Sequence, residues 1–455
     1  MKFLFFLLSY ASLFLILSEK EISVNRVQPP ESIDRAFPPR SHAIIIIANP
    51  GSGHNLQPFL QAAIDSARDG DELQLPEGAF TIYKTVRIHK FISMHGAGAG
   101  KTLLSRPENM PDSILASDSM KCLFQFAIQR EEFSHIVISD ICFQGKRPCV
   151  HTGDGGSMAP DIGLEFIRCL GFTVTRCRFE NFGNAAISVI HSDSKVNGLI
   201  SKNQFYHNVK GPEGLGLGYG IAIFGENKEW TSLPGFGTSN FIFVEENTFS
   251  SHRHAIAAGG CGRYVFRHNM VLNNCIGPHS AQAIDAHEAR QKPGLNYYST
   301  RAVEIYENRI INTTFKDGSA IVPGRSAKDL VENAIVIRGG EALIHDNTIQ
   351  GYRFGIGLIN FEVTTSDRYP LFTQPGYASA IKYGSTHSGS DSIYGDGDLF
   401  AWNNSFSPYQ STDTSSMFYN YQPAYFKEGR DYHLQPKPLY HPYPYPFISL
   451  ETQNE

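Results

Sequence analysis

The chain has 455 residues, among them 41 glycines and 25 prolines, and only 18% of its residues are charged. This composition excludes an ordinary helical protein, because so many glycines and prolines require frequent turns. The formal net charge of −5 gives no basic field that would gather phosphate backbones, so we expect no nucleic-acid partner.

The first 18 residues have the pattern of an export signal. Lys2 precedes an apolar run from Phe3 to Leu17, and polar residues begin at Ser18. The apolar run is short for a bilayer span, which favours a cleaved signal peptide. Ile16, however, fits the small-residue rule for signal cleavage poorly, so an uncleaved anchor is the alternative. We expect no other stable membrane insertion. The chain is expected to be secreted, periplasmic or held at the cell surface.

Residues 19–70 are interpreted as an N-terminal segment and cap. Within them, Asn55–Arg68 has the apolar spacing of one amphipathic helix, which would cover the open end of a stack of strands. Regular coils are expected to begin near Asp71. The first short strands, separated by Gly and Pro, are predicted at Glu72–Leu75, Thr81–Ile88 and Phe91–His95.

The seven cysteines show no metal-ligand spacing such as Cys-x-x-Cys, which argues against a zinc site. In an exported chain Cys142 and Cys149 are placed to close a disulfide loop. The alternative is that the cysteines stack as buried thiols.

An internal repeat decides the fold class. Five strings share an Asn followed two residues later by an apolar residue, at spacings of 44, 22, 39 and 39 residues. A 22-residue unit rich in Val, Ile, Phe and Thr predicts a β-solenoid rung. Each Asn is predicted to take left-handed angles at a turn and to hydrogen-bond to the Asn above and below. These residues are Asn203, Asn247, Asn269, Asn308 and Asn347.

A second repeated string predicts an apolar ladder. Aligning the copies stacks one column of isoleucines, and residues two positions later must point the same way, into the solenoid. The isoleucine column is Ile187, Ile221, Ile256, Ile284, Ile335 and Ile356, and the second column is Val189, Ile223, Ala258, Ala286, Ile337 and Leu358. We therefore predict an all-β chain with a parallel β-helix over residues 71–360. The tail, residues 361–455, is expected to wrap or cap it.

The region from Asp71 to Asn360 resembles the pectin-lyase-like right-handed parallel β-helix superfamily, especially secreted bacterial β-helix repeat proteins. The strings that carry the resemblance are GYGIAIFG, HAIAAGGCGRYVFRHN, QAIDAHE and RAVEIYENRI, with GRDYHLQPKPLYHPYPYP in the tail. Phe447 departs from the tail pattern, where His is usual. The resemblance implies carbohydrate chemistry and leaves its kind open.

Insertions flank the aligned strands at residues 211–218, 226–239, 289–300 and 315–332, which predicts a walled groove over residues 219–360. In the outward rows of these strands only Asp285, His287 and Arg338 are ionisable. Asp285 and His287 would lie about 6.6 Å apart along one strand, and Arg338 about 4.8 Å away on the next rung. Small neighbours (Ala257, Gly259 and Gly357) would leave room for a sugar.

That arrangement predicts a catalytic group. Arg338 would neutralise a uronate carboxylate or act as base, and His287 or Asp285 would handle the second proton transfer. The alternative is an ion-pair network that holds a loop. Asp285 and Glu288 also suggest calcium as a cofactor, although two carboxylates are few oxygen ligands for this ion.

Further residues near the groove are predicted to bind substrate. The patch His252, Arg253 and His254 would grip an anionic glycan or form a solvated turn, and Trp230 would stack on a sugar or pack its loop. Phe224 and Gln282 complete this set.

The sequence thus favours a monomeric, pectate-lyase-like enzyme that cleaves an acidic polysaccharide by β-elimination. Hydrolysis would need facing outward carboxylates, of which only Asp285 is placed. The alternative from another class is a non-catalytic, adhesin-like solenoid that binds a glycan.

Overall fold

In a computed structural model of the chain, the structure is described for a set of ranges that covers most of residues 43–447. The ranges are 25–27, 43–107, 121–128, 130, 134–146, 161–192, 195–208, 217–226, 234–273, 282–287, 290–292, 295–297, 299–315, 319–321, 330–359, 399–408, 415–423, 426–429 and 431–447.

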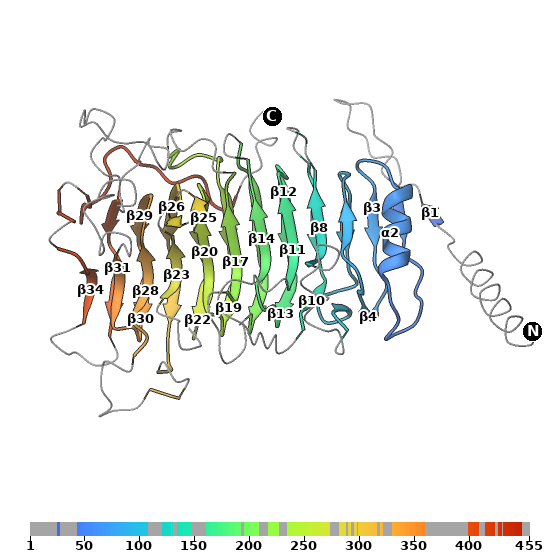
Figure 1. Cartoon of the computed structure of the whole chain (residues 1–455), viewed down its shortest axis with the longest axis horizontal. Helices are drawn as coiled ribbons and strands as arrows, with labels where there is room; N and C mark the ends of the chain where they lie inside the picture. Colours follow the sequence, from blue (N-terminus) through green and yellow to red (C-terminus); the bar gives the residue numbers. More distant parts are fainter. Residues whose placement is uncertain are drawn as a thin grey trace, which may run out of the picture.

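The described residues form a stack of coils with three parallel sheets, which we call A, B and C, running its full length (Figure 1). Each coil contributes one strand to each sheet, so strands far apart in the sequence become neighbours. Backbone groups are satisfied between coils, and side chains of alternate residues fill the interior. This confirms the predicted all-β, right-handed parallel β-helix.

Sheet A is parallel apart from β1, which pairs with β2 in antiparallel fashion. Its strands in spatial order are β1 (Asn25–Val27), β2 (Ile44–Ile46), β3 (Glu72–Gln74), β6 (Ser93–His95), β9 (Val137–Ser139), β12 (Phe172–Thr175), β15 (Gly198–Ser201), β18 (Ile242–Glu245), β21 (Arg263–Arg267), β26 (Ala302–Tyr306), β29 (Glu341–His345) and β32 (Leu399–Trp402).

Sheet B follows sheet A around each coil and consists of short strands. They are β4 (Gly78–Thr81), β7 (Thr102–Ser105), β10 (Cys142–Gln144), β13 (Arg178–Glu180), β16 (Gln204–Tyr206), β19 (Thr248–Ser250), β22 (Met270–Leu272), β27 (Arg309–Ile311), β30 (Thr348–Gln350) and β33 (Ser405–Ser407).

Sheet C completes each coil and carries the predicted apolar ladder. Its strands are β5 (Val86–Ile88), β8 (Cys122–Ala127), β11 (Ile162–Ile167), β14 (Ala185–Ile190), β17 (Tyr219–Phe224), β20 (His254–Gly259), β23 (Gln282–Ala286), β28 (Asn333–Ile337), β31 (Phe354–Leu358) and β34 (Ser416–Asn420). A separate antiparallel hairpin joins β24 (Arg290–Lys292) to β25 (Leu295–Tyr297).

The register of sheet C confirms the ladder. Ile187 pairs with Ile221, Ile221 with Ile256, and the column continues through Ile356. Every member of both predicted columns is at most 1% exposed. The alternation of β-strand side chains therefore suffices to define the core of this face.

The asparagine ladder is also present, with one correction. The side-chain amide of each Asn donates to the carboxamide oxygen of the next: Asn269 Nδ2 lies 3.1 Å from Asn308 Oδ1, and Asn308 Nδ2 lies 2.9 Å from Asn347 Oδ1. The prediction that these Asn take left-handed angles is wrong. The residue before each does so, as at Glu307 with φ 54° and Asp346 with φ 53°. That turn frees the Asn side chain to lie along the stack.

The N-terminal end is closed by helix α2 (Gln57–Ser66), as predicted (Figure 1). Leu60, Ala63 and Ile64 face the interior of the stack. The stack begins earlier than the sequence indicates, because β2 already pairs with β3.

The cysteines in the described residues are buried thiols. Cys142 lies 3.5 Å from Glu180 Oε1 and is free, so the predicted bridge is wrong, and Cys149 itself lies outside the described residues. Burial raises the pKa of Cys142 to about 12, which leaves it inert as a nucleophile at neutral pH.

The C-terminal region adds a further coil, β32 to β34, beyond the point where the repeat is recognisable in the sequence. After it the chain runs back along the outer face of sheet A as an extended segment, residues 436–447, which we call the strap. In Figure 1 this red segment lies over the edge of the stack. Within the described residues there is no helix long and apolar enough to cross a membrane, and residues 1–18 lie outside them.

Candidate functional site

A buried charged cluster lies on the outer side of sheet C, where β23 and β28 end. Asp285 is fully buried, and Arg338 is 4% exposed. The guanidinium donates twice to the carboxylate: Nε to Oδ1 at 2.9 Å and Nη2 to Oδ2 at 2.6 Å. Gln282 Nε2 donates to Oδ2 at 2.9 Å. The structure therefore brings three predicted site residues into one network.

His287 completes this cluster at its solvent side. Its Nε2 lies 3.1 Å from Asp285 Oδ2, and Arg338 Nη2 lies 2.6 Å from both ring nitrogens. A guanidinium has only donors, so the nitrogen that it contacts must accept. A neutral ring can satisfy both neighbours by donating from Nε2 to Asp285 and accepting at Nδ1 from Arg338. Its side chain keeps 18% of its surface exposed.

The charges in the cluster limit the roles predicted for it. Burial alone raises the pKa of Asp285, but Arg338, with His287 and His254, outweighs it and holds that pKa well below its usual value. Asp285 therefore stays ionised and is no proton shuttle. Arg338, doubly bonded to a carboxylate, stays charged and cannot act as the base. Of these three residues, His287 is the one whose side chain can exchange a proton near neutral pH.

The three consecutive residues predicted to grip a glycan separate in the structure. His252 is fully buried: Nε2 bonds Phe205 O at 3.0 Å and Nδ1 accepts from Asn208 N at 3.2 Å. Burial lowers its pKa to about 3, so His252 is a neutral structural group, and the surface patch expected there is not formed.

His254 lies under the cluster, where the structure also buries it completely. Its Nδ1 bonds Gln282 O at 2.6 Å, its Nε2 lies 3.7 Å from Asp285 Oδ2, and burial lowers its pKa to about 3. Its ring stacks on Tyr219, and Arg253 Nη1 donates to the Tyr219 hydroxyl at 3.1 Å. These residues support Asp285 from below and do not reach outward to a ligand.

The outward row expected to hold a sugar is mostly covered. Ala222, Ala257 and Val336 are each 2% exposed. A side chain at Gly357 would collide with the carboxamide of Asn333, so this glycine offers no empty space. Phe224, at 38% exposed, is open to solvent beside His287, whereas Trp230 and most of the inserted segments lie outside the described residues.

Two features of this face were not predicted or were predicted differently. Glu165 occupies the same outward row, fully buried, with Lys121 Nζ at 2.6 Å and Gln125 Nε2 at 2.7 Å. Of the two carboxylates suggested for calcium, Asp285 already accepts hydrogen bonds at both oxygens, and Glu288 lies outside the described residues. Among the described residues no group of three or more His, Cys, Asp or Glu could hold a metal ion.

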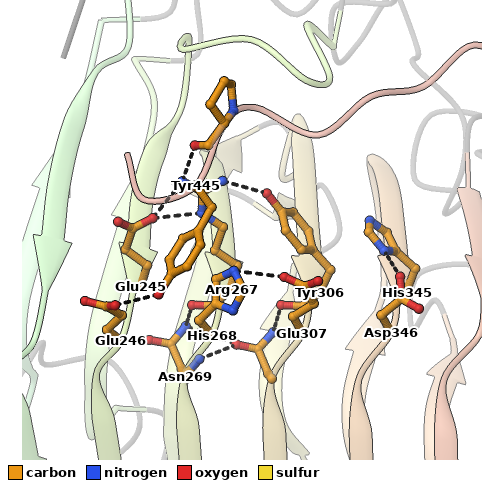
Figure 2. A network of polar contacts seen from close by, with 12 residues as sticks. Glu245, Glu246, Arg267, His268, Asn269, Tyr306, Glu307, His345, Asp346 and Tyr445 are labelled. Carbon is orange, nitrogen blue, oxygen red and sulfur yellow. Dashed lines mark hydrogen bonds and ion pairs between the residues drawn. The ribbon is translucent and has the colours of Figure 1, made fainter. Parts of the chain in front are cut away.

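Sequence reasoning missed a pocket on the opposite side of the molecule, between sheet A and the strap (Figure 2). Its volume is about 570 Å³. The outward column Glu245, Arg267, Tyr306, His345 and Trp402 runs beneath it, each residue two positions before a ladder Asn. That spacing was the available signal: large polar or aromatic residues recur at one fixed position of the repeat.

No family model matches the sequence, and no curated protein matches it. The structure is similar to an alginate lyase from Paenibacillus sp. str. FPU-7, with 11% identity, a TM-score of 0.45, and coverage of 82% of this chain and 97% of that chain. A DFA-IIIase from Arthrobacter chlorophenolicus A6 has 12% identity and a TM-score of 0.44, and the match covers 83% of this chain and 86% of that chain. The Dettilon tailspike protein has 14% identity and a TM-score of 0.38, over 70% and 59% of the two chains. The parallel β-helix fold of this chain is shown by its own three sheets.

Proposed function

We propose that the protein is an exported, carbohydrate-active β-helix that cleaves an acidic polysaccharide by β-elimination, with His287 as the proton-transferring group. The observation that supports this proposal is a partly exposed imidazole held between a buried carboxylate and a guanidinium on the outer face of sheet C. An imidazole oriented by a buried carboxylate is a frequent general base. Exposed Phe224 beside it offers an apolar surface to a sugar ring.

In the proposed reaction the uronate carboxylate of the substrate replaces His287 as an acceptor of the Arg338 guanidinium. Neutralising that carboxylate makes the adjacent C–H more acidic, and the same exchange releases His287 Nδ1 to take its proton. The C–O bond to the leaving sugar breaks, a C=C bond forms, and the imidazolium returns its proton to the leaving oxygen. Asp285 stabilises the imidazolium through Nε2–H and stays ionised.

The charge pattern favours elimination over hydrolysis. Hydrolysis needs a protonated and an ionised carboxyl across the bond. Asp285 is ionised and fully paired, and the next carboxylate described in its outward row is Glu165, four rungs away. At about 4.8 Å for each rung, this separation is too large for a pair that flanks one bond.

The test follows the near-ultraviolet absorbance of unsaturated uronate ends. The chain lacking residues 1–18 is incubated with pectate, alginate and glycosaminoglycans, with and without calcium. We expect a rise with at least one polymer that falls about a hundredfold or more in His287→Ala. A flat trace with every polymer contradicts the elimination.

A matched control lies on the same sheet. His89 follows β5 in the same outward row as His287, near the N-terminal end of the stack, and is exposed. We expect His89→Ala to retain the wild-type rate. An equal loss in both variants would mean that the effect is not local to the cluster.

A second candidate function is glycan binding without turnover. The bidentate pairing of Arg338 with Asp285 favours it, because a buried ion pair of this kind also serves to hold strand ends in place. Retained binding of a polymer with no change in its size or absorbance would support this function over the lyase.

A further inference from the structure

The pocket between sheet A and the strap is formed from rings stacked along the solenoid. Tyr306 stacks on His345 with ring centroids 4.7 Å apart, and His345 stacks on Trp402 at 4.2 Å. Tyr440 from the strap stands edge-on to His345 and to Trp402. Because β32 is the last strand described in sheet A, no further ring of this sheet covers the outer side of Trp402. The indole is half-buried and lines the pocket.

The strap is held firmly, so the pocket exists before any ligand arrives. Arg267 is fully buried and donates from Nη1 to Tyr443 O at 2.6 Å and from Nη2 to Pro444 O at 2.9 Å. Glu245 accepts from Phe447 N at 3.0 Å and pairs with Arg267. Figure 2 shows part of this network, with Glu245 paired to Arg267 beneath the strap and Tyr445 of the strap bonded to Glu246. A wall that needs no ordering on binding lowers the entropic cost of taking up a ligand.

The polar groups of the pocket are arranged for hydroxyl groups. Glu307 and Asp346 come from neighbouring rungs, and their side chains remain 49% and 43% exposed. The side chain of His345 is 7% exposed: Nδ1 bonds Asp346 Oδ2 at 2.7 Å, while Nε2, in the part of the chain that the structure describes, has no hydrogen-bond partner. A buried ring nitrogen that lines a pocket without a partner points to a polar group supplied from outside.

The charge of the lining selects against anions. Glu307 and Asp346 are opposed by one lysine, Lys437. Burial lowers the pKa of His268 and of His345 below their usual value, so both rings are neutral at pH 7. The pocket therefore carries net negative charge and repels a uronate, unlike the cluster on sheet C.

We propose that this pocket binds an uncharged saccharide, with a sugar ring against Trp402 and its hydroxyls bonded to Asp346, Glu307 and His345. The C–H face of a sugar packs on an aromatic ring, whose face is electron-rich, while carboxylates and imidazoles accept or donate to hydroxyls. A volume of about 570 Å³ lies within the range of ligand sites. The site is separate from the proposed lyase centre and does not depend on it.

The first experiment uses Trp402 as its own reporter. The chain has two tryptophans, so Trp230→Phe leaves Trp402 as the single one. The full chain with this substitution is titrated with cellohexaose, laminarihexaose, maltohexaose and mannohexaose, and with hexagalacturonate. We expect a saturable change in emission with at least one neutral hexasaccharide and none with hexagalacturonate. No change with any neutral sugar, or tighter binding of hexagalacturonate, overturns the proposal.

Calorimetry on variants locates the binding. Trp402→Ala should weaken binding of the responding sugar about tenfold or more, and Trp402→Phe, which keeps a ring, less. Asp346→Asn keeps the shape of the site and should also weaken binding, so the test survives if Trp402→Ala fails to fold. Binding that is unchanged in Asp346→Asn and in the folded tryptophan variants contradicts the assignment.

Two controls separate this site from the rest of the molecule. Glu77→Gln makes the same chemical change on an exposed carboxylate near the N-terminal end and should leave binding unchanged. His287→Ala, which removes the proposed lyase activity, should also leave it unchanged. Failure of the lyase proposal and failure of this one are therefore distinguishable.

Discussion

Two of the three outer faces of this solenoid, those of sheets C and A, hold polar clusters of opposite character. On sheet C, Asp285 and Arg338 are buried and bonded to each other, and only His287 reaches solvent. On sheet A, the buried groups anchor the strap, while Glu307 and Asp346 keep nearly half of their side-chain surface exposed. Burial thus separates the polar residues that build the scaffold from those that remain available to a ligand.

The largest effect should come from breaking the buried pair on sheet C. Asp285→Asn leaves Arg338 buried without a counter-charge, so we expect a loss of about 3–5 kcal/mol in the free energy of unfolding, measured by urea denaturation. The double variant Asp285→Asn/Arg338→Met removes both charges and should recover much of that loss. A single-variant loss below about 1 kcal/mol would show that the cluster is not the closed scaffold described above.

Glu304 on sheet A should give the free energy of unfolding a pH-dependent contribution of its own. Burial raises the pKa of Glu304 to about 7, against the lowering effect of hydrogen bonds from Tyr440 and the Gly237 N–H. Between pH 4.5 and 7 Glu304 therefore holds its proton more tightly in the folded state than in the unfolded state, so the contribution of this residue to stability falls as pH rises through this window, by up to about 3 kcal/mol.

The corresponding measurement is the free energy of unfolding at pH 5 and at pH 8 in the wild type and in Glu304→Gln. The substitution should remove this part of the slope, because the amide does not titrate. Parallel profiles for the two proteins would mean that Glu304 titrates near its ordinary pKa.

A smaller effect is expected from the asparagine ladder beside the pocket. Asn308 Nδ2 donates to Phe266 O, Tyr306 O and Asn347 Oδ1, all within 2.9 Å, and the residue is 1% exposed. Asn308→Ala leaves these buried acceptors short of a donor and should cost about 1–3 kcal/mol by urea denaturation. Thr348→Ala, an exposed change on the next rung, should cost less than about 0.5 kcal/mol.

The smallest effect on the free energy of unfolding should come from Glu307, whose carboxylate is exposed at the pocket. Glu307 lies 2.8 Å from His268 at the surface, so Glu307→Gln should change the free energy of unfolding by less than about 1 kcal/mol. Glu245→Gln makes the same change at a carboxylate whose side chain is 3% exposed and pairs with Arg267, and should cost several times more. Equal costs at the two positions would remove the distinction between scaffold and ligand-facing groups.

Much of the fold could be predicted from two periods in the sequence. The repeat shows which strands are neighbours, and the two-residue period of a β-strand shows which side chains enter the core. Once Ile187 and Ile221 are aligned, the strand alternation determines which neighbours enter the core. The left-handed backbone angles at the turns were predicted for the wrong residue. The repeat makes the Asn visible, because the same residue type recurs to form the hydrogen-bonded ladder. The residue that takes the left-handed angles is the one before it, whose type varies from coil to coil. Here the repeat shows where a turn lies without showing which residue bends.

The site was predictable in part for the same reason. Register alone brings Asp285, His287 and Arg338 together, because the three follow equivalent strands. Their burial was not predictable, since the alternation of a strand shows which side chains point outward but not whether anything covers them. The pocket on sheet A was missed because its wall is the strap, which no periodic pattern assigns to any face.

The strap also has a consequence for the order in which the molecule is completed. Phe447 bonds to Glu245 and Tyr445 to Glu246, partners about two hundred residues earlier in the chain. Coils can form one after another as the chain emerges, because each contacts mainly its neighbours, whereas this closure waits for the last segment. A ribosome-bound chain from which residues 436–447 have not yet emerged would thus hold an assembled stack with an uncovered face, and covering that face would be a late step of folding.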